Sequence, residues 1–379
     1  MKNNWSLCFL SVFIMEISCT SVRRIANQEI TLKNNVAQLS FSRKTPLLTV
    51  YVDNNDARFI FDTGATVSVL HDSTIVSNFT NRTFDFFLSA KEADGKKIRN
   101  RKISVLLSSA LFESPNKVLT YINTPLFDCS ARKPYSGIVG MDVFFAEKKS
   151  LQMDFTKNTI ANISQEQLQK AVTAEDYKLV KSSCKLGQIW IFLSVEGVES
   201  PFLLDTGYSG AIIFHEDKKR VFKNNSKLEL EGSIFQTVSS TTQGKETIYE
   251  NMPIRFSDYD LDVKINVSSS IKAQNIGIEF IKAFDWLIDY NHNKVYVKRN
   301  QNKIEDTFKR TISYYAKAQE GKLLVSVKEK SQTRFNIGDQ IIAVNGHKVL
   351  PENICQLMDL LNKTEDWNTL KIETIPVQR

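Results

Sequence analysis

Short runs of alternating apolar and polar residues, separated by polar turns, fill the sequence from about residue 30 to residue 300. Val, Ile, Phe and Thr are frequent in these runs, which is typical of β-strands that bury one face. Residues 163–180 differ, because Gln, Glu, Ala and Lys predominate there, and we expect a short helical or loose linker. The pattern predicts a mainly β protein with few helices.

The chain contains an internal repeat. Residues 47–64 read LLTVYVDNNDARFIFDTG and residues 190–207 read WIFLSVEGVESPFLLDTG. In both, two strand-like runs flank a polar turn and end at Asp-Thr-Gly. The duplication predicts two β-rich units of similar size, at residues 30–162 and 181–300, joined by the linker at 163–180.

The repeat extends beyond these segments. Gly137–Gly140 (GIVG) has a looser counterpart in Asn275–Gly277 (NIG), and residues 151–160 have one in residues 286–295. The last two segments each predict a β-hairpin.

A third pattern begins after Arg299. Residues 323–327 predict a strand, and a second strand is expected to end at a tight Asn345-Gly346 turn. Ile354, Leu357, Leu360 and Leu361 recur at helical spacing, which predicts a helix with this stripe facing a core. We therefore expect a small α+β domain at residues 306–379.

Composition agrees with a folded, multidomain chain. Its 379 residues are 42% hydrophobic and 24% charged, and this length exceeds what one core usually organises. The net charge of +7 is not gathered into a basic run, so nucleic acid is not expected as a partner.

Residues 1–19 are interpreted as an export leader. Lys2 precedes an apolar stretch, Trp5–Ile17, which is too short and too interrupted by Glu16 to span a bilayer. Cys19 follows a small residue, as the lipidated cysteine of a bacterial lipoprotein does. We expect an exported, cell-envelope protein that is lipid-anchored through Cys19 or periplasmic. Export without a lipid and an uncleaved apolar N-terminus are the alternatives.

The cysteines beyond the leader, Cys129, Cys184 and Cys355, lie far apart. An exported chain with so few is not a disulfide framework, and we expect them to be small buried residues. No cysteine or histidine spacing fits a metal site, so neither a metal nor a cofactor is predicted.

The two Asp-Thr-Gly triplets carry the candidate chemistry. Each places a carboxylate, Asp62 or Asp205, where a strand ends at a turn. Hydrolysis of a peptide without a metal needs one carboxylate to activate water and another to protonate the carbonyl oxygen. Two carboxyl groups about 3 Å apart share a proton and can do both. The hydroxyls of Thr63 and Thr206 could link the turns. A turn Asp that caps its own backbone is the alternative, against which the second copy argues.

Each half resembles a unit of a retropepsin-type aspartic protease, and the doubled chain resembles a two-lobed, single-chain member with β-barrel lobes. The resemblance implies a catalytic dyad of Asp62 and Asp205, supported by Thr63, Gly64, Thr206 and Gly207. It also implies flap hairpins over the substrate, with Gly95 and Gly244 as the candidate tips. Tyr208 departs from the family, which has a small residue directly after the triplet.

The C-terminal domain resembles a PDZ domain through Asn336–Gly346 (NIGDQIIAVNG). PDZ domains capture extended peptides or chain ends at a sheet edge. Residues 311–315 take the place of the usual carboxylate-binding loop, which is not evident.

Together these features predict an aspartic endopeptidase that acts on peptide or protein substrates, with a PDZ domain that binds peptide chain ends or regulates access to the dyad. Two alternatives stay open. One is a non-catalytic, peptide-binding pseudoprotease, which Tyr208 and the irregular Asn275–Gly277 element favour. The other has one competent unit and requires a dimer.

Overall fold

The structure, a computed structural model, describes residues 28–42, 44–85, 90–91, 94–98, 101–123, 129, 135–147, 149–185, 187–216, 222, 227–236, 241–304 and 313–377. The predicted leader, with Cys19, lies outside these residues. Strands predominate, so the expected mainly β class is confirmed. Within the ranges given, no helix has the length and apolar character needed to cross a membrane.

The first unit, residues 31–163, is built around a nine-stranded sheet with the path β1-β11-β6-β12-β5-β4-β10-β7. Its elements are β1 (Thr31–Leu32), β2 (Val36–Gln38), β3 (Ser40–Ser42), β4 (Thr45–Val52), β5 (Asn55–Phe61), β6 (Val69–Leu70), η1 (Ser73–Ile75), α2 (Phe79–Arg82), β7 (Thr83–Asp85), β8 (Ala90–Lys91), β9 (Lys97–Ile98), β10 (Arg101–Ser108), β11 (Phe112–Tyr121), β12 (Gly137–Val139), α3 (Met141–Phe144), β13 (Ser150–Asp154) and β14 (Thr159–Ile163).

The β4–β5 hairpin shows how the sequence delivers the first Asp-Thr-Gly. Every second side chain of β4 is buried from Leu48 onward, and Phe59 and Phe61 are buried on β5. Asp53 and Asn54 form the turn with φ of 49° and 68°, the left-handed conformation of a two-residue type I′ hairpin. Burial of one face therefore fixes the register up to the end of β5.

The second unit, residues 178–299, repeats the strand pairings of the first. Its strands β22-β19-β23-β18-β17 follow the order of β11-β6-β12-β5-β4, and β21 pairs with both end strands as β10 does. Its elements are β15 (Lys178–Val180), β16 (Ser182–Lys185), β17 (Gln188–Val195), β18 (Val198–Leu204), β19 (Ile212–His215), β20 (Lys227–Gln236), β21 (Thr241–Phe256), β22 (Tyr259–Ser268), β23 (Asn275–Ile276), α5 (Ile278–Ile281), β24 (Phe284–Asp289) and β25 (Lys294–Arg299).

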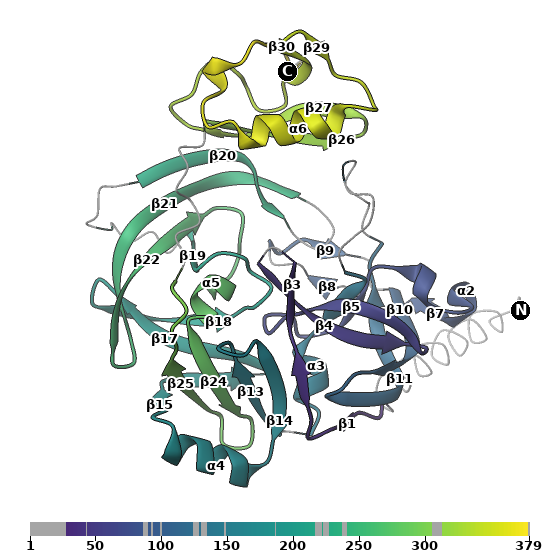
Figure 1. Ribbon diagram of the computed structural model, residues 1–379, viewed down its shortest axis with the longest axis vertical. Coiled ribbons are helices and arrows are strands. Elements are labelled where there is room, and N and C mark those ends of the chain that lie inside the picture. Colours follow the sequence, from purple (N-terminus) through teal and green to yellow (C-terminus); the bar gives the residue numbers. More distant parts are fainter. Residues whose placement is uncertain are drawn as a thin grey trace, which may run out of the picture.

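A six-stranded sheet joins the two units along the path β15-β25-β24-β13-β14-β2. We call it the bridging sheet. Its hairpins β13–β14 and β24–β25 are those predicted at 151–160 and 286–295, and β13 pairs with β24. The linker contains the expected helix, α4 (Gln165–Ala174), which starts with a capping box of Ser164 and Gln167. Figure 1 shows α4 beneath this sheet, at the end of the molecule opposite the C-terminus.

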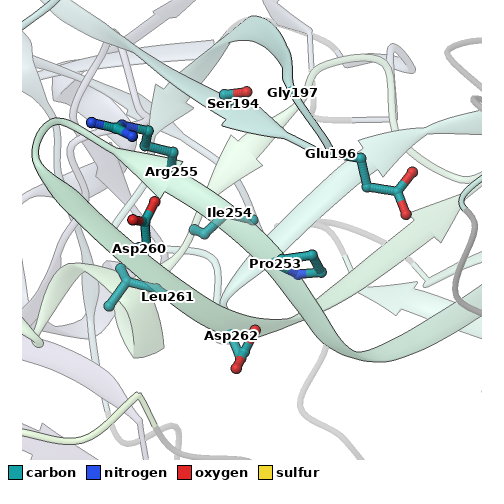
Figure 2. Close-up of a pocket in the computed structure, with 9 residues that line it drawn as sticks. All are labelled: Ser194, Glu196, Gly197, Pro253, Ile254, Arg255, Asp260, Leu261 and Asp262. Atoms are coloured by element: carbon teal, nitrogen blue, oxygen red, sulfur yellow. The ribbon is translucent and has the colours of Figure 1, made fainter.

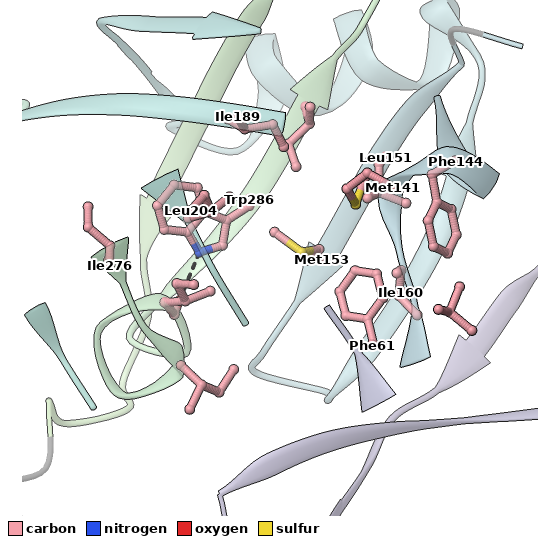
Figure 3. Close-up of a cluster of buried hydrophobic side chains, with 14 of the residues drawn as sticks. Phe61, Met141, Phe144, Leu151, Met153, Ile160, Ile189, Leu204, Ile276 and Trp286 are labelled. Carbon is pink, nitrogen blue, oxygen red and sulfur yellow. Dashed lines mark hydrogen bonds between the residues drawn. The ribbon is translucent and has the colours of Figure 1, made fainter. Parts of the chain in front are cut away.

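Large apolar side chains from both units pack into one core beside the bridging sheet (Figure 3). Trp286 lies at its centre, is fully buried, and donates its indole N–H to the carbonyl oxygen of Ile281 at 2.8 Å. Met153 faces it from the first unit. Truncation of such a side chain costs about 3–5 kcal/mol, so the core holds the two units together.

The C-terminal module, residues 314–377, contains β26 (Tyr314–Gln319), β27 (Lys322–Glu329), β28 (Gln340–Val344), β29 (His347–Lys348), α6 (Ile354–Lys363), η3 (Trp367–Thr369) and β30 (Ile372–Ile375). The predicted strand, Asn-Gly turn and helix are present. One member of the predicted stripe was wrong: Leu360 is 41% exposed, whereas Ile354, Leu357 and Leu361 are buried.

Two attachments hold the module above the other units, where Figure 1 shows it over the β20–β21 hairpin. Strand β27 pairs with β20, with Gly232 opposite Val327, which extends the second unit's sheet. A disulfide joins Cys129, between β11 and β12, to Cys355 on α6. The expectation that the cysteines are small buried residues is therefore wrong for these two, which form a disulfide. Cys184 is free and half-buried, and burial raises the pKa of its thiol.

Candidate active site where the two Asp-Thr-Gly turns meet

Corresponding strands deliver the two predicted carboxylates. Asp62 and Asp205 directly follow β5 and β18, and each of these strands lies beside a short parallel strand, β12 or β23. The backbone N–H of Asp62 donates to the Val139 carbonyl at 3.1 Å, and that of Asp205 donates to Ile276 at 2.9 Å. The same strand geometry therefore positions both side chains.

Each carboxylate is held by the turn that follows it. Asp62 Oδ1 accepts the backbone N–H groups of Gly64 at 2.8 Å and Ala65 at 3.1 Å. Asp205 Oδ1 accepts those of Gly207 at 3.0 Å and Tyr208 at 3.1 Å. Two donors to one oxygen fix the carboxyl plane and leave the other oxygen directed elsewhere.

The threonines link the turns across the junction of the units. The Thr63 hydroxyl donates to the Leu204 carbonyl at 2.7 Å and accepts the backbone N–H of Thr206 at 3.1 Å. Reciprocally, the Thr206 hydroxyl donates to Phe61 at 2.6 Å and accepts the N–H of Thr63 at 3.0 Å. Both threonines are fully buried, so these four bonds are shielded from water.

The glycines bring each turn against the opposite carboxylate. A Cβ atom on Gly64 would lie 2.6 Å from Cγ of Asp205, and one on Gly207 would lie 2.5 Å from Oδ2 of Asp62. No side chain fits at either position without moving a carboxyl group. The predicted supporting residues Thr63, Gly64, Thr206 and Gly207 therefore all lie at the junction.

The two carboxyl groups hydrogen-bond each other and titrate as a pair. Burial raises the pKa of both. The charge of Asp62 and the hydrogen bond between the two groups raise the pKa of Asp205 further, while the same bond lowers that of Asp62. The two carboxyl groups therefore titrate as one coupled pair, and burial together with their mutual charge favours a single negative charge on the pair. Both side chains remain partly exposed, so solvent reaches them.

The predicted apolar-Gly elements lie directly under the turns. A Cβ on Gly140 would lie 2.9 Å from the Ala65 carbonyl oxygen, and one on Gly277 would lie 2.6 Å from that of Tyr208. The residue after each glycine donates its N–H to the same carbonyl, at 2.9 Å and 2.8 Å. Tyr208 therefore leaves the second turn in the geometry of the first.

Sequence reasoning missed a polar contact to the dyad. Asn275 Nδ2 donates to Asp205 Oδ2 at 2.6 Å. Strand register places Asn275 where the first unit has Ile138, so Asp62 lacks an equivalent donor. The signal was present in the sequence as an Asn in an otherwise apolar element.

The two candidate flap tips differ. Gly95 lies between β8 and β9 with φ of 85°, and the neighbouring Asp94 accepts a hydrogen bond from Thr242 at 2.6 Å. Gly244 is not at a tip: it lies within β21 opposite Gly232, and a Cβ there would lie 2.0 Å from the Ser270 hydroxyl oxygen. Close packing explains this glycine, and the last described pair of the hairpin, Gln236 and Thr241, precedes Gly244 in the chain.

Other candidate sites carry less chemistry. In the described ranges, no group of three or more His, Cys, Asp or Glu side chains is placed to hold a metal ion. A hollow of about 440 Å³ lies on the second unit between the β17–β18 and β21–β22 turns and includes no dyad residue. Its acidic side chains, Glu196, Asp260 and Asp262, point in different directions in Figure 2.

No protein-family model matches this chain. No curated protein is significantly similar to it in sequence. Among solved structures, it is similar to conglutin gamma, a basic 7S globulin from lupine seeds, with 9% identity and a TM-score of 0.46 over 72% of this chain and 96% of that one.

Proposed function

We propose that this protein is an aspartic endopeptidase of the retropepsin-like class, with residues 30–162 and 181–300 as its two lobes. The observation that carries the proposal is the pair of adjacent carboxyl groups, one from each repeat, whose turns are cross-linked by four threonine hydrogen bonds. A turn Asp that only caps its backbone would need neither the second carboxylate nor the cross-link.

We place the single proton on Asp205, whose pKa is raised by burial and by the charge of Asp62, and this gives each residue a role. Asp62 takes a proton from a water whose oxygen attacks the peptide carbonyl carbon, while Asp205 gives its proton to the carbonyl oxygen. In the tetrahedral intermediate, Asp62 returns its proton to the amide nitrogen and the C–N bond breaks. Asp205 recovers a proton from the hydroxyl as the carboxylic acid forms. The dyad ends as it began, and no cofactor takes part in these steps.

We further propose that the C-terminal module is a PDZ-like domain that regulates access to the dyad. Its β27 edge is already paired with β20 of the second unit. The edge of β26 that faces α6 is also occupied: Asn362 bonds both the N–H and the C=O of Ala316, at 2.8 Å and 3.0 Å, and Met358 accepts the N–H of Ala318. A peptide strand would have to displace these bonds, which favours regulation over peptide capture.

A binding role without cleavage is the second candidate. Asn275 favours it, because an amide donor on Asp205 Oδ2 stabilises the charged form of the residue that must carry the proton. Export and the lipid anchor at Cys19 remain predictions from the sequence.

The test is cleavage of a denatured protein by the mature chain between pH 3 and 8, with and without pepstatin. Asp62→Asn and Asp205→Asn should each reduce the rate about 10²- to 10⁴-fold while leaving the circular dichroism spectrum unchanged. Activity retained by either variant would exclude a shared dyad. Absence of cleavage at every pH would favour the binding role.

A further inference from the structure

Strand register divides the surface around the dyad into two corresponding halves. Ile60 and Leu203 lie two residues before the Asp of their own unit, so their side chains share its face of the strand. Ile138 pairs with Ile60, and Asn275 pairs with Leu203. The first unit's half and the second unit's half can therefore be compared position by position.

The first unit's half is apolar. Val69, Ile122 and Ile138 form a buried cluster, and Ile60 and Ala65 pack against it. Ala65 donates its N–H to Asp62, so this cluster borders the dyad. An apolar substrate side chain would lose water here without leaving a polar group unpaired.

Two lysines near this half lie inside the protein around one carboxylate. Lys102 pairs across the β10–β11 ladder with Thr120, and its ammonium donates to that hydroxyl at 2.7 Å. Burial lowers the pKa of Lys102 to about 8, while the charge of Asp142 raises it. Asp142 also bonds Lys117 at 2.6 Å. Lys102 and Lys117 are both buried, so neither presents an accessible charge to a substrate.

The second unit's half is polar at three of these positions and apolar at the other two. Asn275 stands in place of Ile138, Tyr208 in place of Ala65, and the buried Ser268 in place of Ile122. Leu203 and Ile213 stand in place of Ile60 and Val69. Asn275 is 5% exposed; its Nδ2 bonds Asp205, whereas its Oδ1 has no partner among the described residues. A buried acceptor beside the dyad thus lacks a donor, which costs free energy until a ligand supplies one.

Glu246 adds a carboxylate to this half. It pairs with Ser268 across the β21–β22 ladder and accepts a hydrogen bond from Asn266, but no cation of the described residues bonds to it. Burial raises the pKa of Glu246 to about 7. Its ladder partner Ser268 is the counterpart of Ile122, which packs with Ile138 beside Asp62, so Glu246 belongs to the second unit's half. Burial, and then the charges of Glu246, Glu279 and Asp205, raise the pKa of Tyr208.

Among the described residues, Glu246 has no counterion. Glu279, the other carboxylate outside the dyad that acts on Tyr208, pairs with Lys44. Around Glu246 itself, Leu230 on β20 and Ser268 on β22 are uncharged neighbours across the ladders. A lysine or arginine side chain brings the positive charge and the several N–H donors that Glu246 and Asn275 could accept.

We propose that the dyad face is asymmetric in specificity: the first unit's half contacts an apolar substrate side chain and the second unit's half contacts a basic one, paired with Glu246. This rests on the proposed function for cleavage, but the binding preference itself does not. The substrate class is a peptide with an apolar residue on one side of the scissile bond and Lys or Arg on the other.

The experiment uses peptides with Leu on one side of the central bond and either Arg or its neutral analogue citrulline on the other, in both orientations. Binding to the Asp62→Asn chain is followed by fluorescence anisotropy, and kcat/KM is measured with the unsubstituted chain. In one orientation, the Arg peptide should bind about 10- to 100-fold more tightly, as expected for a charge-assisted hydrogen bond. Glu246→Gln, which keeps the bond from Asn266, should bring this ratio to about one.

Glu250→Gln makes the same charge change on the same strand and should keep the ratio. The ratio should fall as the pH drops from 8 to 6, because Glu246 then takes up a proton. Equal binding of Arg and citrulline, a ratio unchanged in Glu246→Gln, or no binding of any peptide would overturn the inference. Selective binding without cleavage would instead refute the proposed function and leave the specificity intact, whereas cleavage without selectivity would do the reverse.

Discussion

The threonine cross-link can be tested with one nearly isosteric substitution, Thr63→Val. The change replaces the hydroxyl with a methyl group and removes the donor to Leu204 and the acceptor of the Thr206 N–H. Both backbone groups are then left buried and unpaired. Each unpaired group costs about 1–3 kcal/mol, so the free energy of unfolding should fall by about 2–6 kcal/mol. That is a large share of the 5–15 kcal/mol typical of a folded protein.

Thr63→Ser is the matched control. Serine keeps both hydrogen bonds and loses one methyl group, which is worth about 1 kcal/mol. Urea unfolding followed by tryptophan emission measures the two losses, and amide hydrogen exchange measures protection of Thr206 directly. The valine variant should lose protection at Thr206, and the serine variant should keep it. Equal unfolding midpoints and equal protection in the two variants would refute the view that these hydrogen bonds hold the turns together.

Three further predictions follow from the same junction and from the module above it. The folded-state pKa of Asp205 is raised, so the native state loses stability as the pH rises above the unfolded-state pKa near 4. In urea titrations, Asp205→Asn should therefore gain stability relative to the unsubstituted chain between pH 3 and pH 7. A stability difference that does not change with pH would contradict this. Gly207→Ala places a Cβ 2.5 Å from Asp62 Oδ2 and should lower kcat/KM about 100-fold. Gly321→Ala is the control: it strains a turn of the C-terminal module with φ of 71°, has no atom within 4 Å of the added Cβ, and should leave kcat/KM unchanged. Cys355→Ser opens a disulfide that spans 226 residues and should lower the free energy of unfolding by up to about 5 kcal/mol. It should also raise the cleavage rate of a folded substrate, with Cys184→Ser as the control. An unchanged cleavage rate in Cys355→Ser would argue against regulated access.

Much of the fold near the dyad was predictable, because it follows from local patterns that occur twice. Alternating burial and two-residue turns determine the hairpins that end at Asp62 and Asp205, and the paired triplets locate the junction. The order of strands β11-β6-β12-β5-β4 was not predictable from these patterns, since it depends on parallel pairings between segments far apart in the chain.

The missed features share one physical cause: they are contacts between distant segments. The Cys129–Cys355 disulfide joins residues whose spacing carries no signal, because cysteine connectivity cannot be read from positions alone. Gly244 resembles a turn residue in sequence but is required by the Ser270 side chain packed against it. Leu360 fits the helical stripe, yet the module is too small to cover both edges of α6.

The bridging sheet also determines when the dyad can exist during protein synthesis. Strand β13 ends at residue 154, but its partner β24 begins at residue 284. Roughly 130 residues must therefore be translated between them, which takes on the order of ten seconds. During that interval the edge of β13 is unpaired, a natural site for a chaperone or for mispairing. The nascent chain has Asp62 without a folded partner turn, so hydrolysis by the dyad would begin only after the ribosome has finished both units.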